Sequence, residues 1–194
     1  MEIGATKAVQ DRLKTTKIEE SKGASLVFCW DTHLTKIKGR NVLFIVNASN
    51  RYTIAMTDIE PRNWNYYTMY IRSVIHGVMQ EMGYSEDQIG QYFKMSGDTI
   101  VTKTHGRKSV GGINRMVMDA QYFGKKPEKE AKYQWELSEY LNRDICQPEG
   151  FEAYGYPSEL FKLDMERLGI ISKRKPTKII DFTQYIDTNR STNH

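Results

Sequence analysis

The hydrophobic positions of this chain are organised around a β-hairpin pattern. Two runs rich in β-branched and aromatic residues, 41–47 and 51–56, flank a short polar turn that contains Ser49 and Asn50, which is the composition typical of a hairpin. The first run is apolar at odd and even positions alike, through Val42, Leu43, Phe44, Ile45 and Val46. Because successive side chains of a strand point to opposite faces, this pattern predicts a central strand buried on both faces.

Further strand-like runs lie on either side of the hairpin. Residues 25–30 and 34–38 precede it, residues 99–104 follow it, and the chain starts with a short extended stretch around Ile3. Gly39 turns the chain from the second run directly into the hairpin. Consecutive runs joined by short turns predict neighbouring antiparallel strands, so we expect an antiparallel β-meander of about five strands.

Helical periodicity dominates the remaining sequence. Apolar residues recur at spacings of three and four over residues 61–82, which predicts one long amphipathic helix. Ser85 starts a Ser-x-x-Gln capping box for a second helix, and Ser109 is expected to cap a third. Two more helices are predicted at residues 127–142 and 158–168. The fold class is therefore α+β: the antiparallel meander is covered by helices and followed by a C-terminal helical extension.

A change of composition near residue 126 suggests two parts. Residues 1–126 contain the predicted sheet and its first helices, and form an α+β core domain. Residues 127–194 form an acidic helical extension packed on that core, with a basic linker at 173–176 and a terminal strand at 178–182.

The overall composition is that of a soluble globular protein. The 194 residues are 39% hydrophobic and 27% charged, and the longest apolar run, 42–46, is far short of the roughly 20 residues that a membrane helix needs. Met1 is followed by an acid, where a signal peptide carries basic residues, so we expect a cytoplasmic protein with no membrane contact. Cys29 and Cys146 are expected to be buried thiols rather than a disulfide.

Charge is distributed unevenly along the chain. Residues 100–126 carry six basic side chains and one acidic one, whereas residues 127–166 carry four basic and ten acidic ones. This pattern predicts two electrostatic faces, one for a polyanion and one for a basic protein. The alternative is that both are simply solvated faces.

The basic stretch contains a candidate phosphate site. Residues 106–112 have the glycines and the Lys-Ser pair of a nucleotide-binding loop, but the glycines do not precede Lys-Ser as that motif requires. What remains is a helix start beside basic side chains, which favours a phosphate group. The predicted nucleic-acid or phosphate ligands are Lys103, Arg107, Lys108 and Arg115. Gly111 and Gly112 each cost the helix roughly 1 kcal/mol relative to alanine, which predicts close packing of this turn on the sheet.

The acidic stretch supplies candidate contacts to a protein partner. The predicted partner-binding residues are Glu128, Glu130, Glu136 and Glu139, together with Tyr154 and Tyr156. The acids suit a basic partner, and tyrosines in a loop are common interface anchors. The aromatic side chains could equally be stacking platforms for single-stranded nucleic acid or part of the core.

No catalytic, metal or cofactor site is predicted. His33, His76 and His105 have no cysteine or acid at metal-binding spacing, and the chain lacks a serine elbow. A nuclease site built from two scattered carboxylates stays open as an alternative.

Several short segments resemble a known family. These are Ile3-Gly4-Ala5-Thr6-Lys7, Phe28-x-Trp30, Val46-Asn47 with Arg51-Tyr52, and Thr102-Lys103-Thr104 followed by Arg107-x-Ser109-Val110-Gly111-Gly112. They are similar to a domain of unknown function that occurs in bacteria, plasmids and phages. In that domain the last segment commonly has Asn-Arg-Ser-Val-Leu-Gly-Ser-Met-Asn, from which this chain departs by an inserted Lys108 and by Gly111. The resemblance spans residues 1–165 and implies an α+β fold without established catalytic residues.

The size and mobile-element context also resemble anti-CRISPR proteins. Our first functional hypothesis is a non-enzymatic binding protein from a mobile genetic element, most concretely an inhibitor of a type II CRISPR effector nuclease. The alternatives are an enzyme acting on nucleic acid, either a nuclease or a guide-RNA cleavage factor, and a toxin–antitoxin partner. The oligomeric state is left open.

Overall fold

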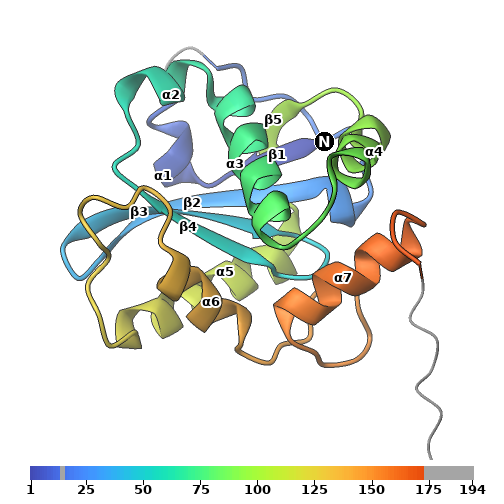
Figure 1. The fold of residues 1–194 in the computed structure, drawn as a ribbon. Helices are drawn as coiled ribbons and strands as arrows, with labels where there is room; N and C mark the ends of the chain where they lie inside the picture. The colour runs from blue at the N-terminus through green and yellow to red at the C-terminus, as the bar shows by residue number, and fades with distance from the viewer. Residues whose placement is uncertain (14–15, 173–194) are drawn as a thin grey trace, which may run out of the picture.

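The computed structural model describes residues 1–13 and 16–172, and the predicted linker at 173–176 and strand at 178–182 lie outside them. Figure 1 shows a five-stranded sheet with helices on both faces. The strands, in the sheet order β4-β3-β2-β1-β5, are β1 (Glu2–Ala5), β2 (Cys29–Ile37), β3 (Arg40–Asn47), β4 (Thr53–Thr57) and β5 (Ile100–Lys103). The helices are α1 (Lys7–Gln10), the short 3-10 helix η1 (Leu26–Phe28), α2 (Pro61–Asn65), α3 (Tyr67–Glu81), α4 (Glu86–Ser96), α5 (Gly106–Tyr122), α6 (Trp135–Asn142) and α7 (Pro157–Arg167).

The predicted α+β class is confirmed, but the purely antiparallel meander is wrong because the sheet is mixed. Strands β2, β3 and β4 form the antiparallel part, whereas β1 pairs in parallel with both β2 and β5. The connection from β1 to β2 covers residues 6–28, and β5 follows β4 only after α2, α3 and α4. Both connections are long enough to bring the chain back in the same direction, which a tight turn cannot do. The two predicted runs 25–30 and 34–38 also merge into the single strand β2, preceded by η1.

The hairpin of β3 and β4 is confirmed and its strands are largely buried, although β4 is an edge strand and β2 is the middle strand of the sheet. Leu43 and Ile45 belong to the larger core, into which α3 packs Ile71 and Ile75. The alternate residues of β3 face the opposite side of the sheet and share a second core with residues of α5 and α6, namely Val42, Phe44 and Val46 with Ile113, Met116 and Leu137. Strand β3 is therefore covered on both faces. No helix in the described part of the chain has the length and hydrophobicity to cross a membrane.

Two predicted helices differ from the observed ones. The helix expected over 61–82 is divided into α2 and α3, because Tyr66 leaves the helical region with φ −112° and ψ 40°. The helix expected over 127–142 begins only at Trp135. The residues before it bond instead to strand β4, since Thr57 N donates to Lys132 O at 2.7 Å and Gln134 N donates to Ala55 O at 2.9 Å.

Side chains of α6 complete the protection of this edge strand. Asn142 accepts from Thr53 N and donates to Thr53 O, both at 2.8 Å, and Ser138 Oγ accepts from Ala55 N at 2.9 Å. Asn142 thus replaces the backbone of a neighbouring strand. An edge covered in this way cannot pair with another chain.

We expect Asn142→Ala to lower the free energy of unfolding by about 2–3 kcal/mol, because the buried N–H and C=O of Thr53 both lose their partner. Urea denaturation followed by circular dichroism measures this, with the exposed Asn114→Ala as the control. A loss below about 0.5 kcal/mol, the range of ordinary surface substitutions, would show that Asn142 does not protect the edge.

Candidate functional site

A buried cluster of charged side chains lies where β1, β2 and the start of α5 meet. His105 Nδ1 lies 2.7 Å from Asp31 Oδ1, and His105 Nε2 lies 3.1 Å from Glu2 Oε2. Glu2 is 2% exposed, Asp31 is fully buried, and the His105 side chain is 8% exposed. The histidine therefore bridges two carboxylates away from water.

The parallel pairing of β1 creates this cluster. Its register places Glu2 beside Cys29 and Gly4 beside Asp31. These four residues share one face of the sheet by the two-residue period of a strand. Strand β5, on the other side of β1, ends at Lys103 and delivers His105 to the N-cap of α5. Residues far apart in sequence are thus brought into contact by strand pairing.

Gly4 makes room for the cluster. A Cβ at this position would lie 1.8 Å from Asp31 Oδ1 and 3.0 Å from His105 Nδ1. Any other residue at position 4 would therefore occupy the space in which the carboxylate and the imidazole meet.

Hydrogen bonds set the protonation of the bridging groups. Burial lowers the pKa of His105, but the Asp31 carboxylate and then Cys29 outweigh it and raise the pKa to about 10. Burial acts to raise the pKa of Glu2, yet hydrogen bonds from Ser21, the Ala24 and Lys22 backbone and His105 hold it below its usual value. His105 is therefore an imidazolium that donates to both acids at neutral pH.

Asp31 also caps α5. Its carboxylate accepts from the His105 backbone N–H at 3.2 Å and from the hydroxyl of Ser109. The helix begins at Gly106, three residues before the predicted cap Ser109. A carboxylate therefore already faces the positive end of the helix dipole, where the sequence predicted a phosphate group.

Basic side chains converge instead beside α5, around a cavity of about 240 Å³. This basic cavity has three basic side chains in its lining, Arg51, Lys108 and Arg115, and one acidic one, Glu149; Ser109, Gly111, Gly112, Gln147 and Pro148 also line it. Lys108 Nζ donates to Pro148 O at 3.3 Å, and Arg51 Nη2 donates to Gly112 O at 3.2 Å. Arg115 pairs with Asp119 at 3.2 Å on the exposed side of the helix.

The four predicted phosphate ligands are separated by the fold. Lys108 and Arg115 meet at the basic cavity, and Arg51, which the sequence did not indicate, joins them. Arg107 is exposed on the first turn of α5. Lys103 lines a different cavity of about 660 Å³, which we call the His105 cavity and which also contains Glu19, Glu20 and His105.

The predicted reason for Gly111 and Gly112, close packing of this turn on the sheet, is wrong. A Cβ at Gly112 would lie 3.3 Å from Arg51 Nε, so the missing side chain lets the guanidinium lie against the helix. Nothing lies within 4 Å of the corresponding position at Gly111, which borders the cavity.

The predicted partner-binding residues are exposed, but only two of them line the same recess. Glu136 and Glu139 line one recess of about 330 Å³ with Asp119 and Asp144, although Glu136 pairs with Lys125 and Glu139 with Arg143. Tyr154 and Tyr156 are exposed in the loop before α7, and Glu128 and Glu130 are exposed before α6.

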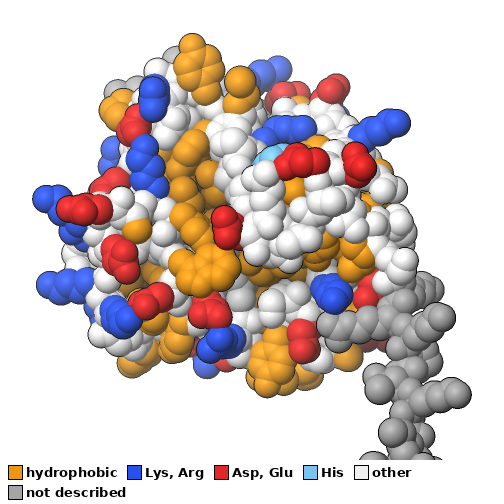
Figure 2. Space-filling model, in the orientation of Figure 1, with side chains coloured by type: hydrophobic (Ala, Val, Ile, Leu, Met, Phe, Trp, Pro, Cys, Tyr) orange, Lys and Arg blue, Asp and Glu red, His pale blue; other side chains and the backbone are white. Residues whose placement is uncertain are grey.

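Figure 2 shows the surface charge on one face of the molecule. Hydrophobic side chains are exposed near its centre beside α3, and acidic and basic side chains alternate around them. Charge on this face is therefore not segregated by sign.

Sequence inspection missed Glu2, Asp31 and His105, because it looked for acids at short spacing from the histidines. The available signal was an acid inside each of two apolar strand runs, at Glu2 and Asp31, together with a glycine within one of them. Acids are seldom fully buried unless they are paired.

The model of a protein family described as a domain of unknown function, DUF6933, matches residues 2–160. No curated protein and no solved structure matches the chain.

Proposed function

The chain belongs to the DUF6933 family, a domain of unknown function, and from its own geometry we propose that it is a non-enzymatic binding protein that takes up phosphate groups of a nucleic-acid strand at the basic cavity. The observation that carries this proposal is the convergence of Arg51, Lys108 and Arg115 on one cavity from two separate elements.

Two of the three basic side chains, Lys108 and Arg115, belong to helix α5. Lys108 and Arg115 are seven residues apart, so they lie on one face of α5 about two turns and 10 Å from each other. Gly111 and Gly112 lie between them; Arg51 lies against Gly112, and nothing lies within 4 Å of the Cβ position of Gly111. A strand laid along α5 can therefore approach the helix closely and meet both cations.

Arg51 reaches the cavity from a strained turn. Its φ of 62° places it in the left-handed region, which costs a residue with a side chain about 1–2 kcal/mol. The buried turn enforces this conformation through Asn47 and Asn50, whose side chains accept from Asn50 N and Tyr52 N. Non-glycine residues held in this way are concentrated at binding and active sites, which supports a role in binding for Arg51.

The size and chemistry of the cavity favour phosphate over a larger ligand. About 240 Å³ suits a phosphate group with its sugar better than a drug-sized molecule. Arginine and lysine are the usual partners of nucleic-acid phosphates, and such contacts are independent of base sequence.

We expect the variant Arg51→Gln, Lys108→Gln, Arg115→Gln to bind a fluorescein-labelled single-stranded 20-mer roughly 10- to 100-fold more weakly at low salt, because three phosphate contacts are lost. Fluorescence anisotropy measures this for DNA and RNA strands. The control is Lys7→Gln, Arg62→Gln, Lys94→Gln, which removes the same charge from α1, α2 and α4. Equal affinity of the two variants would refute the cavity as the binding site.

A basic protein partner is the second part of the proposal, supported by the meeting of Glu136 and Glu139 at one acidic recess. Its most specific form, inhibition of a type II CRISPR effector nuclease by a protein from a mobile genetic element, stays a prediction. The nuclease and toxin–antitoxin alternatives likewise stay predictions.

A further inference from the structure

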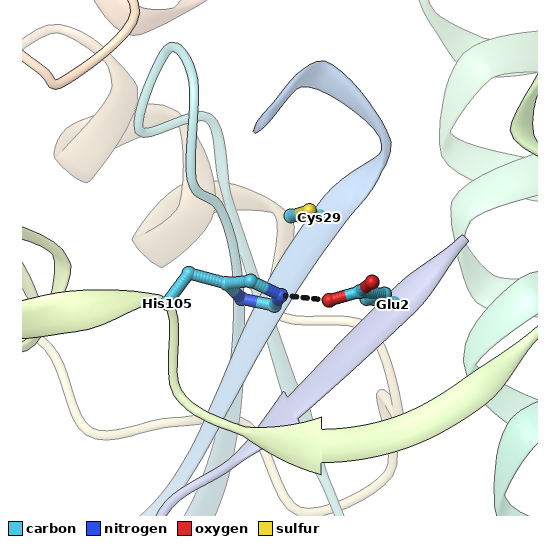
Figure 3. Close-up of side chains that lie close together, drawn as sticks. All are labelled: Glu2, Cys29 and His105. Atoms are coloured by element: carbon cyan, nitrogen blue, oxygen red, sulfur yellow. Dashed lines mark hydrogen bonds and ion pairs between the residues drawn. The ribbon is translucent and has the colours of Figure 1, made fainter. Parts of the chain in front are cut away.

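We propose that Glu2, Cys29 and His105 bind a divalent transition-metal ion, zinc by preference, independently of the basic cavity. Figure 3 shows these side chains on β1, on β2 and after β5, with His105 Nε2 directed at the carboxylate of Glu2. Their possible ligand atoms, a carboxylate oxygen, Sγ and an imidazole nitrogen, all lie within 4.8 Å of one another.

The distances suit a tetrahedral ion. Zinc bonds of 2.0–2.3 Å to oxygen, nitrogen and sulfur place two ligand atoms about 3.3–3.6 Å apart. The pair of Glu2 Oε2 and His105 Nε2 is 3.1 Å apart, so this pair needs to open only slightly. One sulfur, one nitrogen and one oxygen ligand form a donor set that zinc accepts, whereas calcium and magnesium prefer oxygen alone.

The surroundings of His105 match those of a metal-binding histidine. Such residues usually donate their second ring N–H to a carboxylate, which fixes the tautomer and the orientation of the ring. Asp31 stands 2.7 Å from His105 Nδ1 and is itself held by the hydroxyl of Ser109. Gly4 leaves room for this contact, so the orientation of the imidazole is built into the fold.

Three protein ligands leave one position of a tetrahedral ion for water, which is the pattern of reactive rather than purely structural zinc sites. Of the three ligands, His105 lines the His105 cavity of about 660 Å³, so the site borders this cavity at the imidazole. On binding, the metal replaces the proton on His105 Nε2 and the thiol proton of Cys29, and both protons pass to water.

Cobalt substitution tests the proposal on the full chain after treatment with a chelator. We expect Co²⁺ to produce a thiolate-to-cobalt charge-transfer absorption, because Cys29 is a ligand. The absorption should saturate at about one equivalent of Co²⁺, as expected for a site that binds a single ion. Added Zn²⁺ should abolish it by competition. Cys29→Ser should lose this absorption. The matched control is Cys146→Ser, because Cys146 is the other free, buried cysteine and lies outside the cluster; it should retain the signal.

A second variant keeps the test decisive if Cys29→Ser does not fold. Asp31→Asn retains all three ligands and should weaken Co²⁺ binding about 10- to 100-fold while keeping the absorption, as expected for a residue that orients a ligand. Circular dichroism verifies that each variant is folded. Absence of the absorption in the unaltered chain, its persistence in Cys29→Ser or its loss in Cys146→Ser would overturn the proposal.

Discussion

Replacing Gly4 by alanine is expected to destabilise the protein by about 4 kcal/mol or more. Overpacking alone typically costs 1–3 kcal/mol. Here the added Cβ, 1.8 Å from Asp31 Oδ1, also displaces a buried carboxylate from the histidine that pairs with it. Breaking such a buried pair costs about 3–5 kcal/mol by itself. Since a native domain is stable by only about 5–15 kcal/mol, the variant should lose a large part of its stability.

Thermal and urea denaturation measure this loss, and Gly77→Ala is the matched control. Gly77 lies inside α3, and nothing lies within 4 Å of its Cβ position. The same chemical change there should stabilise the protein by about 1 kcal/mol through helix propensity. If Gly4→Ala were as stable as the unaltered chain, the close approach of Asp31 to β1 would be wrong.

Replacing His105 by glutamine should lower the free energy of unfolding by about 3–5 kcal/mol at pH 6 in the presence of a chelator. The substitution removes the cation between Glu2 and Asp31 and leaves two buried carboxylates without a counter-charge. Lys7→Gln is the control, because its ion pair with Asp11 is exposed and such pairs contribute about 0–1 kcal/mol.

The raised pKa of His105 predicts how the stability lost in His105→Gln changes with pH. The pKa of His105 is raised from 6.5 to about 10 in the folded protein, so the native state holds the proton more tightly than the unfolded chain. The resulting stability is fully present below pH 6.5 and is lost as the pH rises through about 10. The difference between the unaltered chain and His105→Gln should therefore shrink from pH 6.5 to pH 10. A difference that is constant over this range would show that His105 is not charged in the fold.

The sequence predicted those parts of the fold that depend on local pattern. The hairpin of β3 and β4 follows from two β-branched and aromatic runs around a polar turn, and α4 follows from a capping box that the structure contains. Strand β1 pairs with residues 29–32 and 100–103. Nothing within four residues of Glu2 specifies either partner or the parallel direction, so the mixed sheet could not be derived.

The candidate sites, like the sheet, could be predicted only where they depend on local sequence pattern. Helical spacing on α5 brings Lys108 and Arg115 to one face, but Arg51 belongs to another element and meets them only through the packing of the β3–β4 turn on Gly112. The segments that resemble the family lie on elements that contact one another in the fold. They contain Gly4 on β1, Trp30 on β2, Arg51 in the β3–β4 turn and Ser109 on α5. Their proximity is a product of the fold that the linear sequence does not display.

The salt dependence of nucleic-acid binding tests the proposed function most directly. For a single strand, the slope of log K against log salt concentration is about −0.7 for each phosphate neutralised. Three cations at the basic cavity therefore predict a slope of about −2 for the unaltered chain, and a slope near zero for Arg51→Gln, Lys108→Gln, Arg115→Gln. The same slope in both proteins, or no binding by the unaltered chain at low salt, would contradict the account.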